Sequence, residues 1–261
     1  MKPNRIADLS VLLEETPEAY YWIGFLMADG HFYKRGAIKL HLAEKDRDHI
    51  NKFREFVKYS GKANSCTMNA MNPLIVHAIM DKFKITNRKT FEPCDISNIN
   101  GELMFSLIVG MLDGDGNVRW RNKTISTFEI KIHRSWLNNL KIIEKFLYSF
   151  LKITRINIGE LSRISKSGYA RMILSDRYLL ASIKKLTIEL KLPTMSRKWD
   201  GIDLTYVSPY KEYRERCPKI LEMVRNKIAY KDIAKKLNIS CAVVATTIYR
   251  ERKKYENMDN C

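Results

Sequence analysis

Two segments of the chain consist almost wholly of apolar or small residues and end in the pair Asp-Gly. They are WIGFLMADG, residues 22–30, and IVGMLDGDG, residues 108–116. An uninterrupted apolar stretch of this kind favours a helix that is buried on most of its sides. Thr16, followed by proline, predicts the N-cap of the first helix. We expect Gly30 and Gly116 to end the two helices in the left-handed conformation.

Alternating apolar and polar residues follow each of these helices and predict antiparallel strands. The segments IKLH, residues 38–41, and IKIH, residues 130–133, match each other. The same alternation occurs at 118–121 and at 169–174, and Ser-Lys-Ser-Gly at 165–168 predicts a hairpin turn. We therefore expect sheets with one apolar face, covered by helices, and one basic, partly aromatic face.

The order of these elements repeats along the chain. Apolar residues at helical spacing follow the strands in each copy, and each copy later reaches an Arg-Lys pair, at 88–89 and at 197–198. Each copy thus reads helix, strands, helix, strands, helix. Matched features in the same order predict an α+β fold with two units, residues 1–100 and 101–207, and a separate tail, residues 208–261.

Composition narrows the class of protein. Hydrophobic residues make up 45% of the 261, which excludes a disordered chain. The five cysteines include no CxxC spacing, so we expect neither a disulfide scaffold nor a zinc site. The longest apolar run, residues 105–112, is too short to span a membrane, and the N-terminus has no apolar signal core. We expect a soluble, intracellular protein with no membrane partner.

The charge predicts a polyanionic partner. Lys and Arg number 46 against 29 Asp and Glu, a net charge of +17. Basic and acidic residues number 15 and 12 in residues 1–100, 18 and 10 in 101–207, and 13 and 7 in 208–261. We expect double-stranded DNA to lie on the basic sheet faces, although polar faces turned to solvent are common in antiparallel sheets. The predicted contact residues on these strands and turns are Lys39, His41, Arg119, Arg121, Lys131, His133, Arg163, Lys166, Tyr169 and Arg171.

Asp29 and Asp115 are unusual because both stand at the C-terminal end of an apolar helix. The helix dipole is negative there, so a carboxylate is disfavoured. One such residue would be an ordinary turn-former before glycine, but two at matched positions of a repeat indicate a nearby cation. Gly24 and Ala28 are four residues apart on the first helix, and Gly110 and Gly114 are four apart on the second. Small residues at this spacing let two helix backbones approach closely.

Packing by that glycine face would place the two carboxylates side by side. Asp29 and Asp115 would then form a divalent-metal site, with the backbone carbonyls of Ala28 and Gly114 and phosphate oxygens as further ligands. Mg²⁺ fits such a site because it prefers oxygen ligands and keeps its waters, and we expect Mn²⁺ to substitute for it.

The two nonapeptides resemble the signature of the LAGLIDADG homing endonucleases, chiefly in the glycine at the third place and the final Asp-Gly. Two copies, over about residues 17–207, resemble the monomeric, pseudo-symmetric branch of that family. The resemblance implies two αββαββα units, with the motif helices at their interface and the sheets forming a saddle on the DNA major groove. It also implies that Asp29 and Asp115 hold the metals and activate water, and it makes Lys89 and Lys198 candidates for contact with the scissile phosphates. The implied activity is a double-strand cut with short 3′ overhangs, as in intron homing.

The chain departs from the family pattern at a few places. Met27 stands at the sixth motif place, where Asp is frequent, whereas Asp113 keeps it in the second copy. Trp22 replaces a smaller apolar residue. The two lysines follow their aspartates by unequal distances, which makes the assignment of Lys89 and Lys198 less direct than that of the two aspartates.

Residues 230–250 resemble a helix-turn-helix. Ala234 supplies the small residue of the first helix, and Asn238 occupies the turn, where a positive φ is needed and Asn tolerates it. A helix over residues 219–226 would complete an all-α three-helix core. The predicted DNA contacts on the second helix are Thr246, Tyr249 and Arg250.

Three other functions fit parts of this pattern. Transcription regulators resembling WhiA join a degenerate motif unit to a helix-turn-helix, but they have lost the acids that this chain keeps. An RNA maturase that binds intron RNA is a second alternative, because members of the family assist splicing. The third is a nucleic-acid-binding scaffold in which both aspartates are structural.

Overall fold

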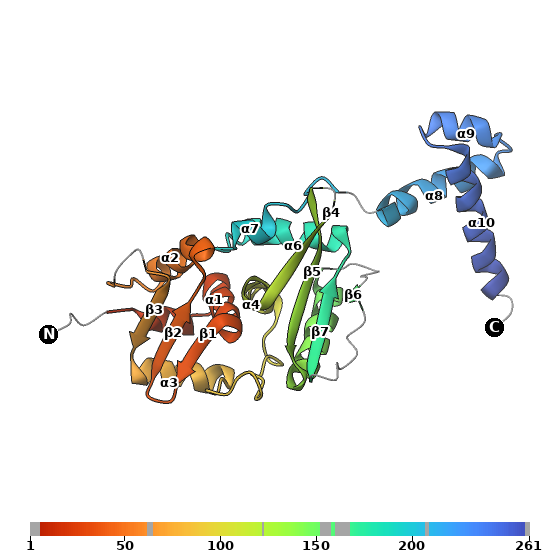
Figure 1. Ribbon diagram of the computed structural model, residues 1–261. Coiled ribbons are helices and arrows are strands. Elements are labelled where there is room, and N and C mark those ends of the chain that lie inside the picture. The colour runs from red at the N-terminus through yellow and green to blue at the C-terminus, as the bar shows by residue number, and fades with distance from the viewer. Residues whose placement is uncertain are drawn as a thin grey trace. The chain divides into compact units, whose positions relative to one another are not determined.

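The computed structural model describes residues 6–61, 65–121, 123–151, 158–159, 168–206 and 209–258; the side chains at 158–159, 209–214, 250 and 252–258 are not described. The chain divides into two compact units, residues 1–205 and 206–261 (Figure 1). Both copies of the repeat lie in the first unit, and the boundary expected between them near residue 100 stays a prediction. The fold is α+β, as predicted.

The first copy carries a three-stranded antiparallel sheet of order β1-β2-β3. Its elements are η1 (Leu9–Leu13), α1 (Pro17–Asp29), β1 (Gly30–Tyr33), β2 (Ala37–His41), η2 (Glu44–Asp46), α2 (Arg47–Phe56), β3 (Thr67–Met71) and α3 (Pro73–Phe83). The described residues thus give this copy one strand fewer than the predicted αββαββα. Thr16 accepts a hydrogen bond from the backbone N–H of Ala19, which confirms it as the N-cap of α1.

The second copy follows the αββαββα order in full and has an antiparallel sheet of order β4-β5-β7-β6. Its elements are α4 (Gly101–Asp115), β4 (Gly116–Arg121), β5 (Thr124–His133), η3 (Arg134–Trp136), α5 (Leu137–Phe150), β6 (Ile158–Gly159), β7 (Tyr169–Leu174), α6 (Arg177–Glu189) and α7 (Ser196–Trp199). The turn expected at 165–168 falls mostly outside the described residues.

The helix pair α1 and α4 lies between the two sheets (Figure 1). Both helices are apolar almost all round, and α1 buries every residue from Ala19 to Met27. An apolar helix of this kind is stable only when neighbours cover all its sides. The shared core of both copies therefore forms around this pair, with Trp22, Phe25 and Phe105 among its fully buried side chains.

Gly30 and Gly116 differ from expectation. Their φ angles are −74° and −73°, and each is the first residue of a strand, so the prediction of a left-handed end was wrong. A Cβ atom would lie 2.6 Å from the Leu26 carbonyl oxygen at Gly30, and 2.1 Å from that of Leu112 at Gly116. Glycine is required there because the chain turns directly from helix to strand, close against the preceding helical turn.

The strand register corrects the match between the two copies. Gly30 lies opposite Leu40, and Gly116 lies opposite Ile130. Lys39 therefore corresponds to Glu129, and the predicted match of IKLH with IKIH is wrong by two residues. The predicted face remains right, because side chains alternate with a period of two and a shift by two keeps them on the same side.

The C-terminal unit is all-α, with α8 (Pro209–Arg225), α9 (Tyr230–Lys236) and α10 (Cys241–Met258). Its own core consists of Ile220, Ile233, Ala234, Val244 and Ile248. Asn238, between α9 and α10, has a φ of 52°, which confirms the positive φ expected at the turn. The helix-turn-helix assignment stays a prediction. No described helix is both long and apolar enough to cross a membrane.

Candidate functional site

Glycines bring α1 and α4 into backbone contact. A Cβ atom at Gly24 would lie 2.0 Å from the Leu107 carbonyl oxygen, and one at Gly110 would lie 2.0 Å from that of Tyr21. Real Cβ atoms do not approach other atoms so closely, so a larger residue at either place would force the helices apart. The structure therefore places both predicted interface glycines at the contact itself.

Asp29 and Asp115 are the last residues of these two helices. Both side chains reach solvent, yet protein atoms surround each carboxylate enough that desolvation raises its pKa. The negative charge of Asp29 raises the pKa of Asp115 further. The two carboxylates are thus within electrostatic reach of each other, at the negative ends of two helix dipoles.

Lys89 and Lys198 bind the carbonyl groups at the ends of the same helices. The Lys89 ammonium donates hydrogen bonds to the Met27 and Ala28 carbonyl oxygens, both at 2.6 Å. The Lys198 ammonium donates to the carbonyls of Leu112 at 3.3 Å and Gly114 at 3.1 Å, and also to that of Asp113. The second lysine thus repeats the part of the first in the other copy, despite the unequal spacing in sequence.

The electrostatic influence of these lysines crosses between the copies. Lys89 caps α1, yet the largest favourable charge acting on its ammonium is that of Asp115 on α4. Lys198 caps α4, and among the charges that lower the pKa of Asp29 its own is the largest. Desolvation lowers the pKa of both lysines, to about 8 for Lys198. Both ammonium groups thus lower the pKa of both carboxylates, and the larger of the two effects on each comes from the lysine of the opposite copy.

The donor set fits a divalent cation held partly by a substrate. Within the described ranges, no group of three or more His, Cys, Asp or Glu side chains could hold a metal ion. Mg²⁺ is commonly bound by one or two carboxylates, with water and substrate phosphates as its other ligands. Asp29 and Asp115 supply that number of carboxylates. The predicted carbonyl ligands, Ala28 and Gly114, already accept hydrogen bonds from the lysines, so a metal would share or replace those bonds.

Asp113 holds the segment that carries Lys198, and sequence reasoning gave it no such part. Its buried carboxylate accepts hydrogen bonds from the Tyr21 hydroxyl at 2.6 Å, the Trp199 indole N–H at 2.6 Å and the Met195 backbone N–H at 3.0 Å. Burial raises its pKa to about 6 against these hydrogen bonds. The only sequence signal was an Asp at the sixth motif place in one copy alone.

An ion pair fixes the same segment from the first copy. The Arg197 guanidinium binds the carboxylate of Asp46, which is nearly buried beside α2, with one N–O distance of 2.8 Å. Residues 195–199 are therefore tied to α4 by Asp113 and to the first copy by Asp46. These contacts hold Lys198 at the helix end.

The buried His49 extends the hydrogen-bonded chain from Asp113. Its Nε2 lies 3.1 Å from the Tyr21 hydroxyl, whose proton is donated to Asp113. The hydroxyl can only accept from His49, so the imidazole carries its proton on Nε2. Its Nδ1 is buried without a hydrogen-bond partner. Desolvation, followed by the charge of Lys52, lowers the pKa of His49 to about 3.

We expect replacement of His49 by glutamine to flatten the acid side of the stability profile. His49 is protonated near pH 6.5 in the unfolded chain but only near pH 3 in the folded chain. The free energy of unfolding therefore falls as the pH drops through that range. The loss between pH 7 and pH 4 is on the order of 3 kcal/mol. Glutamine can still donate to Tyr21 but does not titrate. Urea unfolding of both proteins at pH 7, 5.5 and 4 measures the difference, and parallel profiles would contradict it.

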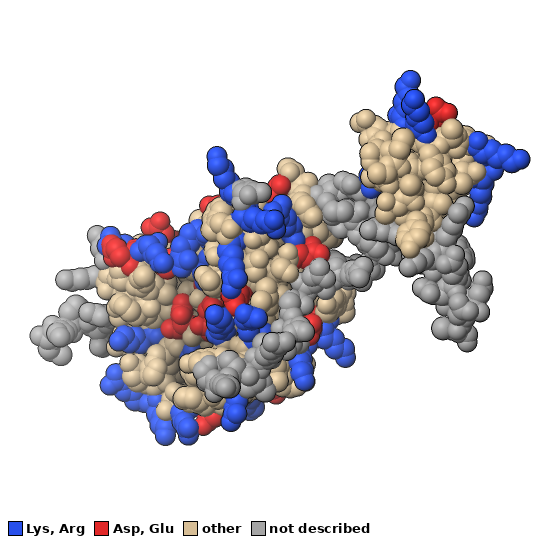
Figure 2. Space-filling view, turned by 45° about the vertical axis from the view of Figure 1, so that its right-hand side comes forward, with Lys and Arg blue, Asp and Glu red and all other residues tan. Residues whose placement is uncertain are grey.

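The predicted DNA-contact residues on the strands lie on the polar faces of the two sheets. Exposed members are Lys39, His41, Arg119, Arg121, Lys131, Tyr169 and Arg171. His133 is half-buried, and its Nδ1 accepts a hydrogen bond from the Ser135 backbone N–H, so it also caps a helical turn. Figure 2 shows Lys and Arg side chains spread over one face of the molecule, with Asp and Glu among them. Arg163 and Lys166 lie outside the described residues.

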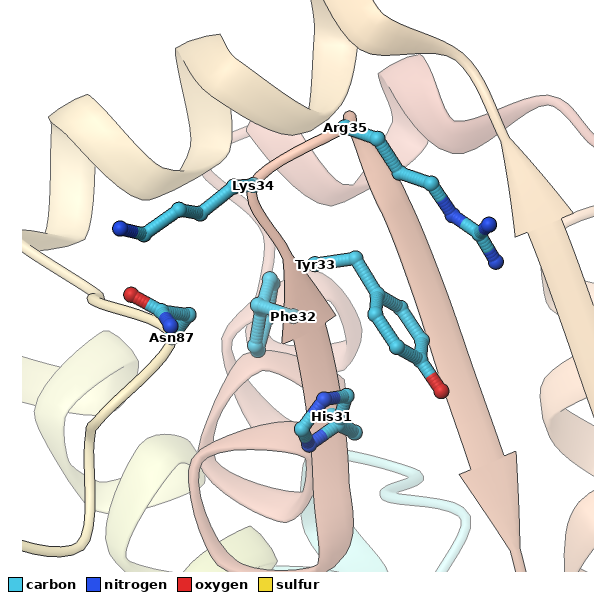
Figure 3. A pocket seen from close by; sticks show the side chains of 6 residues that line it. All are labelled: His31, Phe32, Tyr33, Lys34, Arg35 and Asn87. Atoms are coloured by element: carbon cyan, nitrogen blue, oxygen red, sulfur yellow. The ribbon is translucent and has the colours of Figure 1, made fainter.

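A hollow lies at the end of the first hairpin, and its lining residues were not among the predicted site residues (Figure 3). It is open to solvent, has a volume of about 370 Å³ and is lined by His31, Phe32, Tyr33, Lys34, Arg35 and Asn87. The Arg35 guanidinium lies 5.0 Å from the centre of the Tyr33 ring. His31 and Tyr33 alternate with buried residues of β1, so the alternation after Gly30 was the signal that could have found them.

In the C-terminal unit, Thr246 and Tyr249 are exposed on α10. Arg250 belongs to the same helix, but its side chain lies outside the described part of the chain. Two of the three predicted contacts of this helix are therefore accessible.

No family model matches this sequence, and no curated protein matches it significantly. Among solved structures the chain is similar to the LAGLIDADG homing endonuclease I-GzeII in complex with its DNA target, with 14% identity, a TM-score of 0.47, and 85% of this chain and 97% of the other covered. It is similar to I-SmaMI bound to uncleaved DNA with calcium ions (16%, 0.42, 82% and 93%). It is also similar to full-length DUF199/WhiA from Thermatoga maritima (14%, 0.41, 96% and 92%). LAGLIDADG homing endonucleases, which the two nonapeptides resemble, are thus among these structures, but values this low assign no role to any residue.

Proposed function

We propose that this chain is a site-specific DNA endonuclease that hydrolyses both strands of a duplex with a divalent metal ion and leaves short 3′ overhangs. The observation that carries the proposal is the pair Asp29 and Asp115, at the ends of two helices held in backbone contact. A structural role does not explain two partly desolvated carboxylates at matched, electrostatically unfavourable helix ends. The likeness of both segments to the LAGLIDADG signature supports the same function.

The residues of the site would form two sets, one for hydrolysis of each DNA strand. Asp29 and Asp115 would hold Mg²⁺, which when bound lowers the pKa of water and stabilises charge on the phosphate. Lys198 supplies a positive charge beside Asp29, and Lys89 supplies one beside Asp115. Each scissile phosphate would therefore meet one carboxylate and one ammonium from opposite copies. Both halves of the site come from one chain, so a monomer suffices.

Duplex binding would use the polar faces of both sheets. Their exposed lysine, arginine, histidine and tyrosine side chains can contact phosphates and the base edges of the major groove. These faces carry a net positive charge but also uncharged side chains. This mixture is expected of a surface that must position the protein on the duplex as well as bind it tightly.

Cleavage of a randomised duplex library tests the proposal. We expect double-strand ends of one shared sequence in Mg²⁺, and binding without ends in Ca²⁺. These ends would establish the activity and identify the target together. Binding in both ions with no ends would overturn the endonuclease and favour a regulator or an RNA maturase.

The C-terminal unit would lengthen the recognised site. Its exposed Thr246 and Tyr249 lie on a helix that follows a short turn, which is the arrangement expected of a recognition helix. In the same selection, a chain truncated before residue 208 should recover a shorter consensus and show a smaller dependence of binding on salt. An unchanged consensus would contradict a role of this unit in recognition.

A further inference from the structure

Glu129 is a buried carboxylate on a face that is otherwise basic. It lies on β5, in the central part of the second sheet, and its side chain is only 2% exposed. Its equivalent in the first copy is Lys39. Gly116 and Gly30 each begin the first strand of a sheet, and Glu129 and Lys39 each stand one residue before the residue that pairs with that glycine. Two equivalent positions of the repeat thus carry opposite charges.

Three cations from three adjacent strands surround Glu129. The Arg119 guanidinium on β4 donates to it at 2.7 Å, the Arg171 guanidinium on β7 lies at 3.4 Å, and the Lys131 ammonium on β5 lies at 3.9 Å. Burial acts to raise the pKa of Glu129, but the hydrogen bond from Arg119 and the three positive charges outweigh it and hold the pKa below its ordinary value. Glu129 is therefore an anion at neutral pH.

A carboxylate in this place weakens attraction to phosphates, because it cancels one of the three positive charges. What the Glu129 carboxylate contributes is a fixed orientation of the guanidinium that it binds. A guanidinium has five N–H donors in a fixed plane, and a bond to one of them leaves the others to bind a second acceptor. The side chain of Arg119 remains 58% exposed, so its guanidinium extends beyond the carboxylate that orients it.

The acceptor that fits an oriented guanidinium in duplex DNA is the major-groove edge of guanine, whose N7 and O6 accept two parallel hydrogen bonds. Phosphate oxygens would accept as well, but a phosphate contact gains most from full charge and needs no orienting carboxylate. Within the described residues, Lys39 at the equivalent place forms no ion pair, which suits a contact governed by charge alone.

We propose that Glu129 is a specificity-determining residue, which orients the guanidinium of Arg119 to recognise guanine in the DNA half-site bound by the second sheet. This inference rests on the proposed function, since it requires a duplex on the sheet face. It predicts that the two half-sites are read differently, one with a guanine preference set by Glu129 and one without it.

Selection of bound sequences by the full-length chain tests the inference in Ca²⁺, without cleavage. A randomised duplex library is bound by the wild type and by Glu129→Gln, and the bound pools are sequenced. We expect the substitution to lower guanine preference about tenfold at one or a few positions of one half-site, with the other half-site unchanged. Affinity for a scrambled duplex should rise, and its salt dependence should steepen, because a negative charge is lost.

Two further variants keep the result interpretable. Glu189→Gln makes the same charge change at an exposed position at the end of α6, outside the polar sheet face, and should leave the base preferences unchanged. Arg119→Lys keeps the charge but loses the planar fork, so it should lose the same guanine positions even if Glu129→Gln folds poorly.

The outcomes distinguish a failure of the role of Glu129 from a failure of the proposed function. Unchanged base preferences in both Glu129→Gln and Arg119→Lys would overturn the role of Glu129 while leaving the endonuclease intact. A change of preference spread evenly over both half-sites would also overturn it. A wild type that binds no duplex would overturn the proposed function itself, and the inference with it.

Discussion

Replacing Asp29 or Asp115 by asparagine is expected to lower the rate of double-strand DNA cleavage by about 10³-fold or more. Asparagine has nearly the same shape but no charge, so the site would lose half of the carboxylate charge available to a divalent cation. A loss of roughly 4 kcal/mol in transition-state stabilisation corresponds to that factor. Duplex affinity should stay the same or rise, because a negative charge is removed beside a polyanion. Cleavage under single-turnover conditions, with binding measured in Ca²⁺, gives both quantities.

The single variants should also show which strand each carboxylate serves. If one Asp acts on each strand, either variant should accumulate nicked duplex before double-strand ends. Asp81→Asn, which removes an exposed carboxylate on α3, provides a charge-matched control and should cut normally. Wild-type cleavage by either Asp29→Asn or Asp115→Asn would show that the metal site is elsewhere.

Substitution of alanine for Gly110 is expected to destabilise the protein by about 3 kcal/mol or more. Alanine normally favours a helix over glycine by about 1 kcal/mol, so the sign of the effect depends on the tertiary contact. A Cβ atom at this position would lie 2.0 Å from the Tyr21 carbonyl oxygen and 2.7 Å from the Phe25 backbone nitrogen. Neither atom can move unless α1 moves, and overpacking against backbone is costly. Urea unfolding of the variant measures the loss.

A neighbouring position offers a matched test that the contact, and not the residue type, is responsible. At Gly114 a Cβ atom would lie 2.3 Å from the side-chain Cβ of Ala28. Gly114→Ala should therefore also destabilise the protein, but Ala28→Gly in the same chain should restore most of the loss. The double-mutant cycle gives the coupling between them. If Gly110→Ala were stabilising, the close backbone contact between α1 and α4 would be wrong.

The sequence predicted the site more fully than the contacts that hold it. Matched Asp-Gly pairs and small residues indicated two helices in contact with an aspartate at each end, because these features are local and repeat. The network of Asp113, Tyr21 and His49 could not be predicted, because its members lie in different helices and are far apart in sequence. No periodicity relates a buried polar side chain to a distant partner, and only the packed core brings them together.

Register shows the same division between local and tertiary information. Alternation identified the polar face of each strand, including Lys131 and Arg171, because the period of two is a property of the backbone. Alternation could not decide which residue of one copy corresponds to which residue of the other, because a shift of two residues leaves the pattern of apolar and polar positions unchanged. The hairpins decided this, and the second has a longer first strand, with six residues in β4 against four in β1. Glu129 therefore went unnoticed as the counterpart of Lys39.

The sequence by itself determined the α+β class, the repeated unit, the two apolar helices and the residues at their ends. These follow from hydrophobic periodicity and local turn chemistry, which act over a few residues. The tertiary structure alone decided that Lys89 and Lys198 cap the helix ends, that the lysine of the opposite copy has the larger favourable effect on each aspartate, and that Glu129 binds Arg119 and Arg171. The reason is physical: burial and electrostatics depend on distances between elements, and these are fixed only when the two copies pack together around α1 and α4.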